Sequence, residues 1–278
     1  MTFRWTPGQE PPPFVLTMAG RARIVLRGGA LIAILAAGAL AMALLRLVER
    51  PLHGARRPWT PHITRAVCRL ALVVLGIRYR LEGRPMTHRG AVVANHASWL
   101  DIFVLNAGMC IYFVAKSEVA RWPGIGFLAR LVGTVFIDRD RKQERAQLEL
   151  FEERLLAGHK LLFFPEGTSS DGFRVLPFKT TLFEAFFNQH LKPVMHLQPV
   201  TVIYDAPPGA DPRFYGWWGE MGFAPHLARV LAAPAGGAVR VICHEPLRVA
   251  DFSDRKALAG HVEEVVRAGM PPQRRLSR

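Results

Sequence analysis

The longest apolar segment of the chain is Gly28–Leu45, which carries no charged or polar side chain. Arginines flank it on both sides: Arg21, Arg23 and Arg27 come before it, and Arg46 and Arg50 follow it. A helix needs about 20 apolar residues to cross a bilayer core, so the run is marginally long enough. The pattern predicts a hydrophobic helix that anchors the chain to a membrane. A buried core helix is the alternative, and the late start of the run disfavours a cleaved signal peptide.

A second apolar stretch, Ala66–Ile77, is interrupted by Arg69 and is too short to span a bilayer. It favours an interfacial helix whose arginines reach the lipid headgroups. A basic, breaker-rich connection over residues 50–58 joins the two stretches, which could therefore span once or lie on one leaflet. Because both flanks are basic, their charge leaves the orientation open. We expect a membrane-associated helical region over residues 1–77.

From residue 78 onward, β-type segments alternate with helical ones. The predicted strands are Ala91–Asn95, Ile111–Ala115, Val132–Ile137, Leu161–Phe164, Pro199–Tyr204 and Ala238–Cys243. The predicted helices are Ser98–Ala107, Pro123–Leu131, Arg141–Ala157 and Leu182–His190. This alternation indicates an α/β domain over residues 78–270, with a mixed, largely parallel central sheet flanked by helices. Residues 271–278 are expected to form a loose basic tail.

Composition and charge narrow the class of partner. The 278-residue chain is 50% hydrophobic, yet its formal net charge is +14. Strong basicity implies an anionic partner, and the hydrophobic content favours membrane lipid over nucleic acid. The Trp217-Trp218 pair, a candidate for base stacking, is better interpreted as core or interface anchor. Three widely separated cysteines and scattered histidines predict buried thiols in a reducing compartment and no metal site.

Candidate chemistry begins with His96 and Asp101. On one continuous helix, five residues turn through roughly 500°, which would keep the two side chains apart. If a strand ends before His96 and a helix begins near Ser98, the carboxylate can fold back toward the imidazole. A carboxylate that orients a histidine is the base half of a Ser-His-Asp arrangement, here without its own nucleophile. The pair suits an enzyme that deprotonates a hydroxyl of its substrate; the alternative is a packing histidine beside a strand.

Further polar segments follow strand ends, where α/β proteins usually place their sites. Arg139 follows the segment Gly133–Asp138 and could hold a phosphate or carboxylate in bidentate fashion, unless it pairs with a neighbouring aspartate. The loop after Phe164 could present backbone N–H groups to an anion, with Thr168 or Ser169 as hydroxyl donors. Glu166 would brace an arginine or recognise a substrate hydroxyl; an ordinary turn is the alternative.

Two lysines could add positive charge to the same pocket. Lys179 precedes a helical pattern, and Lys116 follows the predicted strand Ile111–Ala115. For both, an ordinary solvated lysine is the alternative.

Taken in order, these segments resemble the motifs of the glycerolipid acyltransferase family, over roughly residues 75–205. Asn95-His96-Ala97-Ser98-Trp99-Leu100-Asp101 resembles its NHxSxxD block, and Gly133 to Arg139 its GxxFxxR block. Phe164-Pro165-Glu166-Gly167-Thr168 resembles its FPEGT block, and Gln198-Pro199-Val200 its final proline-containing block. Each block is weak alone, whereas four in this order and spacing are highly specific.

The resemblance implies a membrane-associated O-acyltransferase. His96, oriented by Asp101, would take the proton from a lysolipid hydroxyl, which would then attack the thioester of acyl carrier protein or acyl-coenzyme A. No metal or other cofactor is implied. Arg139, Glu166, Gly167 and Thr168 would bind the polar head of the acceptor. We expect such an enzyme at the bacterial inner (cytoplasmic) membrane, with its active site facing the cytoplasm.

One departure bears on the acceptor. Many family members that make phosphatidate carry arginine after EGT, whereas this chain has Ser169-Ser170-Asp171-Gly172. The EGTSSDG form, and the run Ala115–Val119, resemble the branch that acylates lyso-ornithine lipid, whose head is zwitterionic. The first expectation is 1-acylglycerol-3-phosphate, the commoner acceptor in the family, and lyso-ornithine lipid is the alternative. Thioester hydrolysis and a non-enzymatic membrane- or nucleic-acid-binding protein are the other readings.

Overall fold

The computed structural model describes residues 5–6, 14–122, 124–137 and 144–275. Its centre is an eight-stranded sheet with the strand order β1-β7-β6-β2-β5-β3-β4, and β8 pairs with β6 beside this path. The strands are β1 (Arg78–Glu82), β2 (Gly90–Ala94), β3 (Tyr112–Lys116), β4 (Val135–Ile137), β5 (Leu161–Phe163), β6 (His196–Asp205), β7 (Ala238–Cys243) and β8 (Leu247–Arg248). All pairings are parallel except those of β6 with β7 and β8. The predicted mixed, largely parallel sheet is confirmed.

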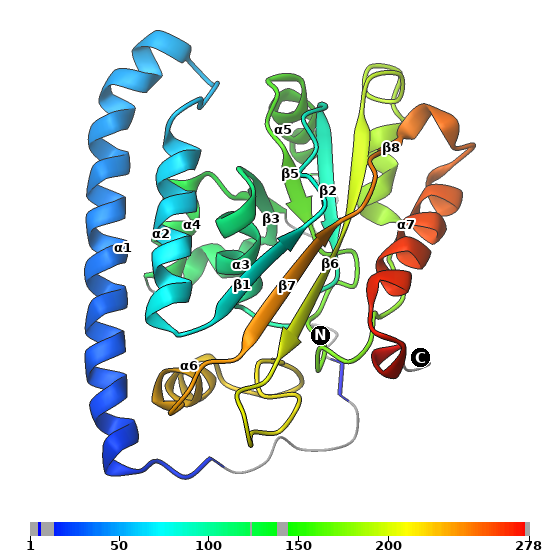
Figure 1. Ribbon diagram of the computed structural model, residues 1–278. Helices are drawn as coiled ribbons and strands as arrows, with labels where there is room; N and C mark the ends of the chain where they lie inside the picture. The colour runs from blue at the N-terminus through cyan, green and yellow to red at the C-terminus, as the bar shows by residue number, and fades with distance from the viewer. Residues whose placement is uncertain (1–4, 7–13, 123, 138–143, 276–278) are drawn as a thin grey trace.

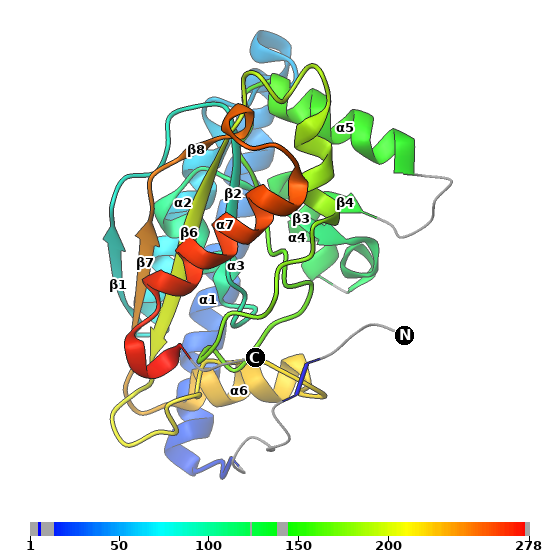
Figure 2. The same cartoon turned by 90° about the vertical axis from the view of Figure 1, so that its right-hand side faces the viewer.

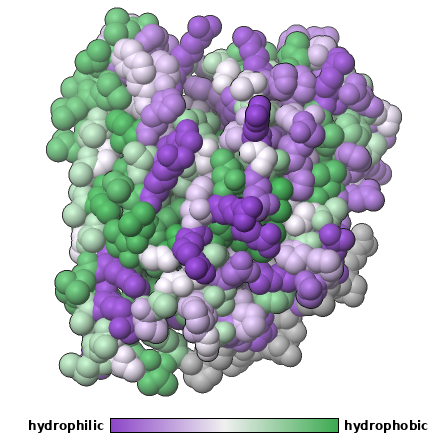
Figure 3. All heavy atoms as spheres, viewed as in Figure 1, coloured by the Kyte–Doolittle hydropathy of each residue, from purple (hydrophilic) through white to green (hydrophobic). Residues whose placement is uncertain are grey.

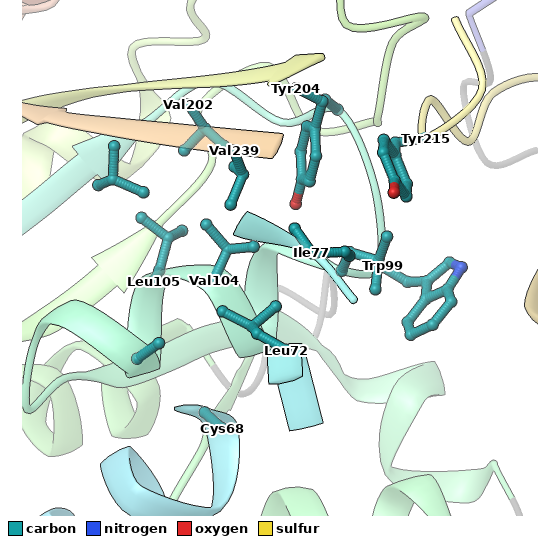
Figure 4. Packing of buried hydrophobic residues seen from close by; sticks show 14 of the residues in the cluster. Cys68, Leu72, Ile77, Trp99, Val104, Leu105, Val202, Tyr204, Tyr215 and Val239 are labelled. Atoms are coloured by element: carbon teal, nitrogen blue, oxygen red, sulfur yellow. The ribbon is translucent and has the colours of Figure 1, made fainter. Parts of the chain in front are cut away.

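Helices cover both faces of this sheet (Figures 1 and 2). They are α1 (Met18–His53), α2 (Thr60–Val74), α3 (Asp101–Gly108), α4 (Ile125–Val132), α5 (Glu144–Leu156), α6 (Phe223–Ala232) and α7 (Arg255–Gly269). Shorter 3-10 segments are Ser117–Arg121, Thr181–Phe187, Val249–Asp251 and Pro272–Arg274. One apolar core lies between the sheet and helices α2, α3 and α6, and Figure 4 shows part of it. A second core joins the other face to α5, α7 and the segment Thr181–Phe187.

Strand β2 lies in the middle of the sheet, between β5 and β6, and all five of its residues are buried. Asn95, directly after it, ties the strand end to β6: its amide donates to the carbonyl of Val202 at 3.0 Å and accepts from the N–H of Val202 at 2.7 Å. A buried amide with both groups satisfied fixes the backbone where the next residue, His96, begins the turn into α3.

Helix α1 lies along one side of the molecule and packs against α2, α4 and α6. A Cβ at Gly38 would lie 2.3 Å from a methyl carbon of Val67 on α2, so glycine permits this close approach. The outer side of α1 is apolar and exposed, and Figure 3 shows this face as a band of hydrophobic residues. By length and composition, α1 is the one helix in the described part of the chain that could cross a membrane.

Several arginines of the apolar helices bind backbone carbonyls. Arg23 and Arg27 donate to the carbonyls of Leu231, Ala232 and Ala233 at the end of α6. Arg69 of α2 donates to the carbonyl of Ala107 near the end of α3. These contacts satisfy orphan carbonyls and suit the negative end of each helix dipole. Arg69 is exposed as well, and its contact with lipid headgroups stays a prediction.

Some predicted boundaries also differ. Val132 is the last residue of α4, Gly133 ends that helix with φ +84°, and the strand begins only at Val135. The predicted helix Leu182–His190 is a 3-10 segment, Thr181–Phe187. The predicted loose tail is held as far as Arg275, because Arg274 binds the carbonyl of Tyr204 and the carboxylate of Asp205.

Candidate active site

His96 and Asp101 meet in the turn between β2 and α3, as the sequence predicts. His96 Nδ1 lies 2.7 Å from Asp101 Oδ2. Asp101 is the first residue of α3 and is fully buried, whereas 20% of the His96 side chain is exposed. Because Nδ1 faces the carboxylate, the other ring nitrogen, Nε2, is left to accept a proton from a substrate hydroxyl.

Four groups hold the Asp101 carboxylate. Besides His96, the backbone N–H groups of Ala97 and Ser98 donate to Oδ2 at 2.9 and 3.1 Å. The hydroxyl of Tyr204, at the end of β6, donates to Oδ1 at 2.8 Å. These contacts satisfy both oxygens of a fully buried carboxylate. Asp101 is thus fixed both by its own turn and by a strand more than a hundred residues away.

The backbone of His96 is held by Glu166, which is buried. One carboxylate oxygen accepts from the N–H of His96 at 2.6 Å and the other accepts from the N–H of Leu176 at 2.7 Å. Burial raises the pKa of the Glu166 carboxyl well above its usual range, while these two hydrogen bonds act to lower it. This differs from the expected contact with an arginine or a substrate hydroxyl. Glu166 therefore orders the turn that carries His96 and Asp101.

The imidazole of His96 lies against an aromatic ring. Phe164 stacks on it with a centroid separation of 4.0 Å and an interplanar angle of 10°. Phe164 directly follows β5, which is paired with β2, so neighbouring strand ends place the two rings together. The stacking restricts rotation of the imidazole and supports the orientation set by Asp101.

The loop after Thr168 supports the same turn. The N–H of Ser170 donates to the carbonyl of His96 at 2.9 Å, and the hydroxyl of Ser169 donates to the carbonyl of Trp217. Trp217 in turn donates its N–H to the carbonyl of Ala97 at 2.8 Å. Asp171 is buried and pairs with Arg174 at 3.2 Å. The serines therefore serve as scaffold, and the position directly after Thr168 carries Ser169 rather than a guanidinium.

Both predicted lysines approach the Glu-Gly-Thr loop. Lys116 donates to the carbonyl of Gly167 at 3.0 Å. Gly167 has φ +71°, and a Cβ there would lie 2.7 Å from Nζ of Lys179, so glycine lets the ammonium group come close. Thr168 lies beside them and is partly exposed. Arg139 lies outside the described residues. The structure thus gathers His96, Asp101 and five of the six predicted binding residues near one edge of the sheet.

Sequence reasoning missed Tyr204, Ser170 and Trp217 as supports of the site. Tyr204 ends a strand that was predicted, and a polar group at a strand end was the available signal. The contacts of Ser170 and Trp217 are to backbone carbonyls of the turn, and no spacing in the sequence encodes them. Trp218 is buried, in agreement with its interpretation as a core residue.

A histidine oriented by a buried carboxylate suits proton removal from a hydroxyl that the substrate supplies. The comparisons with known proteins agree with this chemistry. A family model described as Acyltransferase matches residues 77–203. The lyso-ornithine lipid O-acyltransferase of Rhodobacter capsulatus is 59% identical over 95% of this chain and 96% of its own length.

More distant relatives include the 1-acyl-sn-glycerol-3-phosphate acyltransferase of Neisseria meningitidis, which is 33% identical over 64% of this chain and 68% of its own length. The crystal structure of the 1-acyl-sn-glycerophosphate (LPA) acyltransferase from Thermotoga maritima shares the fold, with a TM-score of 0.62 and 24% identity over 90% of this chain and 95% of that one. The chain belongs to the acyltransferase family, and within it the protein is a lysolipid O-acyltransferase.

Proposed function

We propose that the acceptor is a lyso-ornithine lipid, acylated on its free hydroxyl. The observation that carries this is the similarity to the Rhodobacter capsulatus enzyme, which extends over nearly the whole of both chains. The loop after Thr168 supports it, because Asp171 is neutralised by Arg174 and Ser169 and Ser170 bind backbone groups. A zwitterionic head needs less positive charge there than a phosphomonoester. The carboxylate of such a head would lie near Lys116 and Lys179.

Transfer would proceed in one displacement. His96 Nε2 accepts the hydroxyl proton while the oxygen attacks the thioester carbonyl, and Asp101 stabilises the imidazolium that forms. The tetrahedral intermediate then breaks its C–S bond, and the thiolate leaves and recovers the proton from His96. The donor in this proposal is acyl carrier protein or coenzyme A carrying the chain as its thioester, with no further cofactor.

The proposed location is the cytoplasmic side of the bacterial inner membrane. Acyl thioesters are cytoplasmic compounds, and three free cysteines, two of them buried, suit a reducing compartment. Helix α1 packs along the body of the protein from Gly20 to Glu49 and exposes its opposite side. A helix held in this way is better suited to lie in one leaflet than to cross the bilayer alone.

The second candidate acceptor is 1-acylglycerol-3-phosphate. The Neisseria relatives and the two lysines at Gly167 favour it. The deciding experiment supplies purified protein with an acyl carrier protein thioester and either lyso-ornithine lipid or lysophosphatidate. We expect product from the first and little from the second, and none from a folded His96→Ala variant. Preferential acylation of lysophosphatidate would overturn the proposal, and thiol release without acceptor would indicate a hydrolase.

A further inference from the structure

A basic pocket lies at the opposite edge of the sheet from His96, beside the turn between α1 and α2. Its volume is about 470 Å³. The pocket is lined by Arg46 and Arg50 of α1, the turn residues Gly54, Ala55 and Arg57, and Arg154 and His159 at the end of α5. Figure 1 shows the α1–α2 turn at the top, whereas β6, which is parallel to β2, points to the bottom. The pocket is therefore separate from the acyl-transfer site.

Positive charge in this pocket is poorly compensated. Burial, followed by the charges of Arg46 and Arg154, lowers the pKa of Arg57 to about 10. The charge of Glu49 opposes this change, but the Glu49 carboxylate already accepts from the N–H groups of Trp59 and Thr60 and from the Thr60 hydroxyl. Like charges at close range repel more strongly when they are partly withdrawn from water. A bound anion would relieve this repulsion.

The pocket is built around its guanidinium groups. Arg154 is held by the ring of His159 at 2.6 Å and by the carbonyl of Gly133 at 3.0 Å. A Cβ at Gly133 would lie 2.3 Å from Nη1 of Arg57, so glycine leaves room for this side chain. Both Arg57 and Arg154 lie over the ring of Tyr112, at 5.7 and 4.8 Å from its centroid. These contacts orient the two planar groups before any ligand arrives.

One buried nitrogen at the pocket, Nη1 of Arg46, has no hydrogen-bond partner among the described residues. Buried donors are nearly always satisfied in folded proteins, so the lack of a partner there is itself a sign of a ligand. Helix dipoles account for Arg50 and Arg154, which lie in the last turns of α1 and α5, but they do not account for Arg57 in the turn between α1 and α2.

The side of α1 that faces away from the pocket is apolar and exposed. Leu44, Val48 and Leu52 lie about 140–180° around the helix from the mean direction of Arg46 and Arg50, and all three are more than half exposed. Helix α1 is also the helix in the described part of the chain that is apolar enough to cross a membrane. When its apolar side enters the membrane, the arginines near its end lie close to the lipid phosphates, which favours a lipid over a free anion.

We propose that this arginine pocket, formed by Arg46, Arg50, Arg57 and Arg154, binds the phosphate group of an anionic membrane lipid. Such a lipid holds the α1–α2 end of the protein at the membrane surface. The site is distinct from the acceptor site at His96 and does not depend on which lysolipid is acylated.

The test is the thermal melting of the full chain with short-chain phosphatidylglycerol, short-chain phosphatidylcholine or inorganic phosphate at equal ionic strength. We expect phosphatidylglycerol to raise the melting temperature most. The double variant Arg50→Gln/Arg57→Gln, whose arginine side chains form no hydrogen bond with the described residues, should lose this shift. The matched control Arg248→Gln/Lys256→Gln removes the same charge beside α7, on the other face of the sheet, and should keep it.

Other outcomes would count against the proposal. An equal shift with inorganic phosphate would assign the pocket to a free anion, and an unchanged shift in the Arg50/Arg57 variant would exclude it as the lipid site. Arg57→Lys, which keeps the charge but not the planar fork, should retain part of the shift. His96→Ala should retain all of it. Acyl transfer measured in parallel on the Arg50/Arg57 variant separates failure here from failure of the proposed function.

Discussion

The catalytic turn and the arginine pocket handle charge in opposite ways. At the turn, the buried carboxylates of Asp101 and Glu166 are each met by several donors, so the site is complete without a ligand. At the pocket, guanidinium groups converge, and Nη1 of Arg46 has no hydrogen-bond partner among the described residues. The difference indicates that the first site is organised for chemistry and that the second is complete only with a bound anion.

The largest expected effect is that of His96→Ala. Removal of a general base lowers turnover by about 10²- to 10⁴-fold, and we expect a loss in this range with little change in melting temperature. The variant should still bind membranes, because the arginine pocket is untouched. Steady-state acyl transfer together with vesicle flotation checks both points. Transfer at the wild-type rate in a folded variant would rule out His96 as the base.

Acid should affect both regions through buried histidines. Burial lowers the pKa of His226, behind the catalytic turn, and of His159, in the pocket, to about 4 each. Both remain neutral in the folded protein while the unfolded chain takes up protons. Each neutral imidazole therefore contributes fully to the unfolding free energy above about pH 6.5, and this contribution is lost as the pH falls toward 4. The loss is at most about 3 kcal/mol for each imidazole.

Added lipid should change the contribution of His159 to the pH dependence of unfolding but not that of His226. His226 accepts from the indole N–H of Trp99 at 2.8 Å and does not line the arginine pocket. An anion in the arginine pocket would favour protonated His159, so phosphatidylglycerol should reduce the decrease in unfolding free energy at acid pH. A His159→Gln variant should lack this response. Unfolding measured between pH 4 and 7 with and without lipid checks the prediction. An equal lipid response in both proteins would contradict it.

A smaller effect is expected for Tyr204→Phe. The change removes the donor to Asp101 Oδ1, so the carboxylate is held less firmly and orients His96 less well. We expect about tenfold lower kcat, equivalent to about 1.4 kcal/mol, with KM little changed. A purely structural role would instead lower the melting temperature and leave kcat of the folded fraction unchanged. Tyr215→Phe is the matched control, because Tyr215 binds the N–H of Gly237 and its ring lies 5.5 Å from Tyr204.

The sequence predicted the catalytic turn better than its supports. A histidine and an aspartate five residues apart required a strand, a turn and a helix start, and all three are present. Glu166 was recognised, but its binding to the N–H groups of His96 and Leu176 depends on how distant segments fold together. Tyr204 reaches Asp101 only because β6 and β2 are neighbours, and no local pattern encodes that pairing.

Arginine placement was the least predictable feature. Charge alone could not separate Arg23, Arg27 and Arg69, which bind helix-end carbonyls, from Arg46 and Arg57, which face the pocket. The two groups differ in their neighbours in the folded chain. The first group lies at the ends of α6 and α3, whereas the second group lies beside other guanidinium groups.

The smallest expected effect tests that distinction within the pocket. Arg57→Gln removes a charge whose protonated form is disfavoured by burial and by neighbouring arginines, so it should raise the unfolding free energy, by less than about 1 kcal/mol. Arg154→Gln should lower it, because Arg154 also binds the carbonyl of Gly133 and the ring of His159. Urea unfolding of the lipid-free protein gives both values. If Arg57→Gln were as destabilising as Arg154→Gln, the guanidinium of Arg57 would be serving the fold, and the comparison between an organised site and an uncompensated one would no longer hold.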